Sequence, residues 1–203
     1  MPFPRTWTEE LITEWLALKE YAVESGIPVN TTDAGGRNEV DVIGYKITNN
    51  NEIEIIHIEI TALAPSPKEK EKIEQKFSET IKQNLVEHIR KKINIANLQN
   101  IIYKKIYVDT YSKKDKIENL NQDPTLKEKE IQVKRLIDLI IHDIIPTIKQ
   151  WKESPPHKPK SKGNITLPDS YWLLKLIDYL IDEKLITTEA QHNLSRSHRN
   201  PLS

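Results

Sequence analysis

The chain has 203 residues, and its 30 basic and 30 acidic residues cancel to a formal net charge of zero at pH 7. The length suits one domain of ordinary size with an appendage, and the zero net charge singles out no class of binding partner. The sequence contains no cysteine, which excludes disulfides and thiolate metal sites.

Membrane and export signals are missing from the sequence. No apolar run approaches the roughly 20 residues needed to cross a bilayer. The first five residues, Met-Pro-Phe-Pro-Arg, do not have the pattern of a signal peptide. We therefore expect a soluble cytoplasmic protein with no membrane partner.

Charge is distributed unevenly along the chain. Residues 1–65 contain four Lys or Arg against eleven Asp or Glu, whereas residues 66–105 contain ten against five. An acidic segment followed directly by a basic one would suit a metal site beside a surface for a polyanion. Charged helices with solvated faces would give the same distribution, so charge alone leaves both interpretations open.

The first elements in chain order are a helix and a short strand. Apolar residues recur at helical spacing from Leu11 to Val23, and Thr6 suits the N-cap of this helix. Gly26 is expected to end it. Residues 27–29 then read as a short strand or the lead into one.

Two further strands are predicted at residues 39–47 and 52–62, joined by a polar hairpin turn at residues 48–51. Each strand carries one acid among apolar residues, Asp41 in the first and Glu59 in the second. A carboxylate that leaves water needs a cation or a hydrogen-bond donor beside it. Two such acids on neighbouring strands therefore indicate one shared cation.

The remainder of the chain is predicted to be mostly helical. Together with the preceding elements it gives an α/β core at residues 1–124 and a helical C-terminal extension at residues 125–203. The predicted elements are a long amphipathic helix at 68–95, a strand at 101–110, a helix at 125–151, a Pro- and Lys-rich linker at 153–164 and a last helix at 168–184.

The order of elements and the two strand acids resemble the PD-(D/E)XK nuclease superfamily, which includes type II restriction enzymes and Holliday-junction resolvases. The likeness covers residues 6 to about 110. It is carried by Gly-Ile-Pro-Val, by Gly-Arg-Asn-Glu-Val-Asp-Val-Ile-Gly and by Ile-Ile-His-Ile-Glu-Ile-Thr. It implies a restriction-endonuclease-like core, in which a mixed sheet is flanked by helices.

The resemblance also implies metal-dependent hydrolysis of DNA, in restriction or defence. Asp41 and Glu59 would bind Mg²⁺, with Mn²⁺ as a substitute, the backbone carbonyl of Ile60 would complete the site, and Glu14 on the first helix would assist. Mg²⁺ prefers hard oxygen ligands and keeps several waters, one of which can attack the phosphorus. Related enzymes often act as dimers, so a homodimer is a further expectation.

One departure from the family pattern concerns the catalytic lysine. The third-strand motif is normally Glu-X-Lys, and here Thr61 stands in place of the lysine. Lys76 on the next helix could replace it, or the Thr61 hydroxyl could position the water. The third alternative is a catalytically inactive nuclease fold that only binds DNA or acts as a scaffold.

Other residues are candidates for contacts with DNA. Arg37 and Asn38, in the loop before the first acid, could contact the DNA backbone, and could equally cap the strand. Lys68 and Lys72 on the long helix would neutralise phosphates without regard to sequence.

Aromatic and imidazole side chains near the acids have two interpretations. His57 alternates with Glu59 and should share its side of the strand. It could contact phosphate or a metal-bound water, but a structural role is favoured. Tyr103, Tyr107 and Tyr111 are expected to pack in the sheet rather than to stack on bases.

Overall fold

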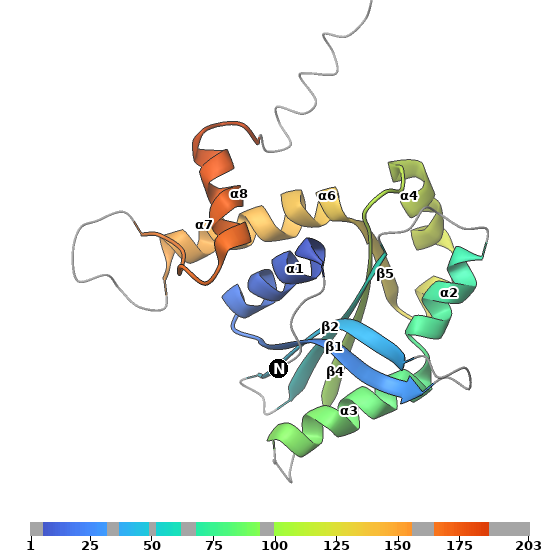
Figure 1. The fold of residues 1–203 in the computed structure, drawn as a ribbon. Helices are drawn as coiled ribbons and strands as arrows, with labels where there is room; N and C mark the ends of the chain where they lie inside the picture. The colour runs from blue at the N-terminus through green and yellow to red at the C-terminus, as the bar shows by residue number, and fades with distance from the viewer. Residues whose placement is uncertain are drawn as a thin grey trace, which may run out of the picture. The chain divides into compact units, whose positions relative to one another are not determined.

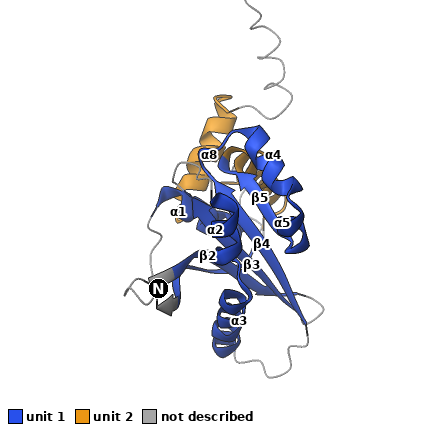
Figure 2. Cartoon of the chain, turned by 90° about the vertical axis from the view of Figure 1, so that its right-hand side faces the viewer, with its two compact units in different colours: residues 1–136 blue, residues 137–203 orange. Residues whose placement is uncertain are grey.

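The computed structural model describes residues 6–31, 37–48, 52–61, 68–93, 100–155 and 165–186. The chain divides into two compact units, residues 1–136 and residues 137–203 (Figure 2). The first unit contains α1 (Trp7–Leu18), β1 (Ala22–Thr31), β2 (Arg37–Ile47), β3 (Ile53–Thr61), α2 (Glu69–Lys76), α3 (Glu79–Ile93), β4 (Ile101–Asp109), α4 (Lys114–Gln122), α5 (Pro124–Glu128) and β5 (Ile131–Arg135).

The first unit is α/β, with one five-stranded mixed sheet in the order β1-β2-β3-β4-β5 (Figure 1). The pairs β1–β2 and β2–β3 are antiparallel, whereas β3–β4 and β4–β5 are parallel. Parallel neighbours need a crossover connection. Helices α2 and α3 supply it between β3 and β4, and α4 and α5 supply it between β4 and β5.

Helices cover both faces of the sheet. Under α1, a Cβ added to Gly44 would lie 3.0 Å from Leu16 Cδ1, so the missing side chain lets this helix approach β2. Ile43 is adjacent to Gly44 and its side chain therefore points to the other face. There it packs in one buried cluster with Leu85 and Ile89 of α3.

Helix α1 begins as predicted but ends earlier. Thr6 is its N-cap and accepts a hydrogen bond from the backbone N–H of Glu9 at 3.2 Å. The helix ends at Leu18, and the predicted continuation to Gly26 is wrong, because Ala22 and Val23 already pair with β2. An apolar stripe that continues from a helix into a buried strand does not mark the junction.

The predicted single helix at 68–95 is two helices, α2 and α3, separated at Phe77 and Ser78. Apolar residues at four-residue spacing, Ile73, Phe77 and Ile81, are buried on both sides of the break. The periodicity therefore gives no sign of it. The break ends α2 at Lys76.

The helix predicted at 125–151 is also wrong, because residues 131–135 form the fifth strand of the sheet. Ile131 and Val133 alternate with exposed or half-buried residues and pair in parallel with β4. This strand extends the first unit beyond the predicted boundary at residue 124. Both side chains join Ile73 of α2, Phe77 just after this helix and Tyr107 of β4 in a second buried cluster.

The second unit is helical. It contains most of α6 (Leu136–Leu139), a π-helical turn (Ile140–Ile144), α7 (Ile145–Glu153) and α8 (Trp172–Asp182). Lys152 of α7 forms an ion pair with Asp178 of α8 at 2.9 Å. Residues 156–164 of the predicted linker lie outside the described residues. Among the described helices, none combines the length and the apolar character needed to cross a bilayer.

Candidate functional site

The two strand acids meet where the ladder between β2 and β3 ends. Paired residues run from Ile47–Ile53 to Val42–Ile58, and the next position of this register sets Asp41 opposite Glu59. The two carboxyl groups interact with each other by charge and by a hydrogen bond. The structure therefore brings these acids together, as the sequence predicts.

A local irregularity in β1 accompanies this arrangement. The register of β1 with β2 pairs Ser25 with Val42 and Ile27 with Val40, which leaves Gly26 across from Asp41. Gly26 has a φ of 61°, in the left-handed region that glycine adopts without a steric penalty. The sequence prediction gave this glycine a different task, that of ending a helix.

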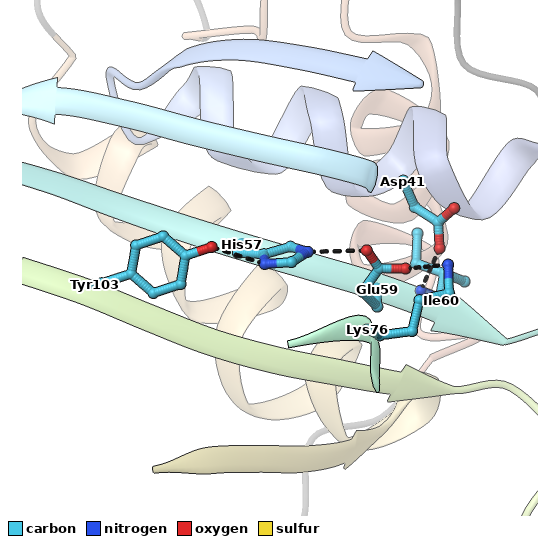
Figure 3. A network of polar contacts seen from close by, with 6 residues as sticks. All are labelled: Asp41, His57, Glu59, Ile60, Lys76 and Tyr103. Carbon is cyan, nitrogen blue, oxygen red and sulfur yellow. Dashed lines mark hydrogen bonds and ion pairs between the residues drawn. The ribbon is translucent and has the colours of Figure 1, made fainter. Parts of the chain in front are cut away.

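Asp41 is held by the backbone of β3. Its Oδ2 accepts a hydrogen bond from the N–H of Ile60 at 2.7 Å (Figure 3). The N–H and C=O groups of one strand residue point to the same neighbouring strand. The Ile60 carbonyl therefore points toward β2 and Asp41, as its predicted role in the metal site requires.

Each carboxylate oxygen of Glu59 has a polar partner. Its Oε1 lies 2.8 Å from His57 Nε2, and its Oε2 lies 2.5 Å from Lys76 Nζ (Figure 3). The Glu59 side chain is only 1% exposed, whereas that of Lys76 is 44% exposed. Lys76 thus reaches the acid from the last residue of α2, and its position agrees with the first of the three alternatives for the catalytic lysine.

His57 connects the site to the interior of the sheet. Its side chain is fully buried, its Nδ1 lies 2.8 Å from the Tyr103 hydroxyl, and its ring centroid lies 4.6 Å from that of Phe77. A fully buried imidazole with both nitrogens bonded cannot contact a phosphate, so that interpretation of His57 is wrong. Tyr103 packs in the sheet as expected. Its hydrogen bond to His57 was not indicated by the sequence.

Burial shifts the pKa values of these groups. Burial and the neighbouring Glu59 charge raise the pKa of Asp41 from 3.8 to about 6. Burial raises the pKa of Glu59 from 4.5 to about 7, although Lys76 acts in the opposite direction. Burial also lowers the pKa of His57 to about 3, so this imidazole is neutral.

Lys76 remains charged at the site. Burial alone would lower its pKa, but the charges of Glu59 and Asp41 raise the pKa above the usual lysine value. One ammonium thus faces two carboxyl groups. Any cation that replaced or joined it would stabilise the ionised form of both acids.

The donor set is small and made of oxygen atoms. Within the described ranges, no group of three or more His, Cys, Asp or Glu side chains is arranged to hold a metal ion. Asp41 and Glu59 form a pair. Such a pair fits Mg²⁺, which is often bound through one or two carboxylates and keeps several waters.

The remaining predicted site residues occupy different places. Glu14 is buried on α1, 3% exposed, and α1 packs against β1 and β2; its assistance to the metal stays a prediction. The Thr61 hydroxyl bonds to Tyr107 and its carbonyl accepts from Thr110 Oγ1 at 2.8 Å. These contacts tie Thr61 to β4 and its continuation, which weighs against a role in positioning water.

The predicted DNA contacts are not all where the sequence placed them. Arg37 and Asn38 were predicted in a loop but begin β2, where they pair with β1; their side chains lie outside the described residues. Lys68 precedes the first turn of α2 and Lys72 lies within this helix, and both are exposed. Their contact with DNA stays a prediction.

No family model, curated protein or solved structure matches this chain. The assignment of the site therefore depends on its own geometry.

Proposed function

We propose that this chain is a metal-dependent endonuclease that hydrolyses DNA phosphodiester bonds. The observation that carries the proposal is the meeting of Lys76 with Glu59 and Asp41. Two carboxylates and one ammonium from three different elements are the groups that the PD-(D/E)XK resemblance requires. The lysine missing from position 61 is thereby supplied by α2.

The fold supports the same proposal. A helix, three antiparallel strands, a helical crossover and a parallel fourth strand follow each other along the chain. This is the order expected of a restriction-endonuclease-like core. Strand β5 and the helices of residues 137–203 would be additions to that core.

The residues at the site fit a divalent cation. Asp41 and Glu59 would hold Mg²⁺ or Mn²⁺, with the Ile60 carbonyl facing the same side. A bound cation of this kind polarises a phosphoryl oxygen and lowers the pKa of its water. Burial raises the pKa values of both acids, and the Glu59 charge further raises that of Asp41, so such a charge would stabilise their ionised forms.

Lys76 would act on the substrate. Nearly half of its side chain is exposed, so the ammonium is within reach of a phosphate that enters from solvent. An ammonium beside a phosphoryl group offsets the charge that develops in the transition state. Glu59, which is almost fully buried, would stay in place.

Cleavage of supercoiled plasmid tests the proposal. We expect nicking in Mg²⁺ or Mn²⁺, none in EDTA, and a loss of at least about 100-fold in rate for Asp41→Asn, Glu59→Gln and Lys76→Met. Lys72→Met, one turn earlier on α2, is the matched control. It should weaken DNA binding at most and retain the rate at saturating protein.

Other outcomes separate the remaining functions. DNA retention at low salt without cleavage under any metal would refute the nuclease and favour the non-catalytic DNA-binding module. Parallel assays with single-stranded RNA would show which nucleic acid is preferred. Sedimentation with and without a DNA duplex tests the predicted homodimer, in which each subunit would cut one strand.

A further inference from the structure

A line of hydrogen bonds runs from β4 through β3 to the candidate site. The Tyr103 hydroxyl bonds to His57 Nδ1, and His57 Nε2 bonds to Glu59 Oε1, each at 2.8 Å. We propose that His57 and Tyr103 are positioning residues that fix Oε1 of Glu59 and leave Oε2 to the divalent cation. Lys76 would occupy Oε2 only until the cation arrives. This inference rests on the proposed function.

The partners of His57 determine where its hydrogen lies. In a neutral imidazole one ring nitrogen donates and the other accepts. In its ionised form, which pairs with the Lys76 ammonium, Glu59 can only accept. Nε2 must therefore carry the hydrogen and donate to Glu59, while Nδ1 accepts the hydrogen of the Tyr103 hydroxyl. The tyrosine hydroxyl, which can donate or accept, completes this tautomer by donating to Nδ1.

The two partners of Glu59 differ in how easily they can leave. The imidazole is fully buried, its ring packs against Phe77, and both of its nitrogens are bonded. The Lys76 side chain is 44% exposed, and its ammonium lies at the end of a long flexible chain that starts from the last residue of α2. A hydrated cation that approaches from solvent can displace the ammonium and cannot displace the imidazole. Oε2 is accordingly the oxygen available for exchange.

Packing alone would not require this arrangement. The rings of Phe77 and Tyr103 pack beside the His57 ring and would do so for any apolar side chain, yet Nε2 is directed at Glu59, the acid that pairs with Lys76. Hydrogen bonds to a ligating carboxylate orient it, and their loss weakens metal binding by about 10- to 100-fold. The proposal therefore predicts an effect on metal affinity that is separate from any effect on folding.

Calorimetric titration with Mn²⁺, without DNA, tests the proposal. His57→Leu should bind Mn²⁺ about 10- to 100-fold more weakly than the natural chain. His57→Gln, whose amide nitrogen takes the place of Nε2, should restore affinity to within about 3-fold, as expected if one retained donor is sufficient. Tyr103→Phe should give a smaller loss. Phe77→Leu is the packing control, and should lower the melting temperature without changing Mn²⁺ affinity.

Two outcomes would overturn the proposal: a folded His57→Leu chain that binds Mn²⁺ as tightly as the natural one, or a His57→Gln chain as weak as His57→Leu. Nitrogen NMR of the imidazole, with its signal identified by its loss in His57→Gln, supplies a readout that needs no metal. An Nε2–H tautomer that persists in Tyr103→Phe, where Glu59 still accepts from Nε2, supports the positioning role, and an Nδ1–H tautomer overturns it.

These measurements keep the two proposals apart. If the natural chain binds no Mn²⁺ and cuts no DNA, the nuclease fails. The tautomer of His57 still decides whether the imidazole holds Glu59.

Discussion

Asp41→Asn should make the protein more stable while removing its response to metal. The pKa of Asp41 is raised from 3.8 to about 6, and each pKa unit corresponds to about 1.4 kcal/mol. The ionised carboxylate therefore destabilises the fold by up to about 3 kcal/mol at pH 8. Asparagine removes the charge and keeps an oxygen that can accept from the Ile60 N–H. We expect a gain of about 1–3 kcal/mol.

The pH dependence of this gain has a definite sign. A group whose pKa is raised by folding contributes stability below its unfolded pKa, and this contribution is lost as the pH rises through the folded pKa. The advantage of Asp41→Asn should therefore be absent near pH 3.8, grow between 3.8 and about 6, and stay constant above that range.

Thermal unfolding at several pH values measures both effects. About 2–4 °C of melting temperature is expected for each kcal/mol in a chain of this size. Mg²⁺ at ten times its dissociation constant should add about 1.4 kcal/mol to the natural chain and nothing to Asp41→Asn. A variant that is less stable at pH 8, or that responds to Mg²⁺ like the natural chain, would refute the reasoning.

Asp109 is the matched control, because its pKa is shifted in the opposite direction to that of Asp41. It is likewise an aspartate of the sheet, but in spite of burial the donors of Ser112 and Tyr111 hold its pKa below the ordinary value. Asp109→Asn should therefore destabilise the fold at neutral pH, and its penalty should shrink as the pH falls through the unfolded pKa. Similar behaviour of the two variants would mean that charge at the site is not the cause.

Three further results are expected. Mn²⁺ affinity should fall as the pH drops through about 7 and then about 6, because protons compete for Glu59 and Asp41; a flat titration profile would contradict this. Thr6→Ala should lower the unfolding free energy by about 1 kcal/mol in urea, through loss of the α1 cap, and no change would argue against the cap. Gly44→Ala should destabilise by about 1–2 kcal/mol, since its Cβ would press on Leu16 at 3.0 Å; increased stability would show that α1 can move aside.

Sequence reasoning identified the strands that carry the acids because each acid interrupts an apolar strand run. Asp41 and Glu59 stand out in this way, and antiparallel pairing sets them opposite each other. Lys76 was named as a candidate for the missing lysine because its turn of the predicted helix could face back toward the strand. Its contact with Glu59 depends on where α2 ends, and the spacing of apolar residues does not encode that end.

Other features depended on register and could not be deduced from spacing. Tyr103 lies 46 positions from His57, and only the parallel alignment of β3 with β4 brings the two together. Gly26 resembles a helix terminator, since a glycine that ends a helix and one that distorts a strand share the same positive φ. Strand β5 was missed because five residues are too few to override a neighbouring helical pattern.

The interruption between α2 and α3 has a consequence for assembly. In a Glu-X-Lys strand the acid and its cation arrive together as soon as that strand pairs. Here the ammonium belongs to Lys76 of α2, in the connection between β3 and β4. If the sheet has formed and α2 has not yet packed against it, Asp41 and Glu59 repel each other with no ammonium beside them. Local opening of α2 would therefore silence the site while the sheet stays intact, and amide exchange in this short helix should report how often that happens.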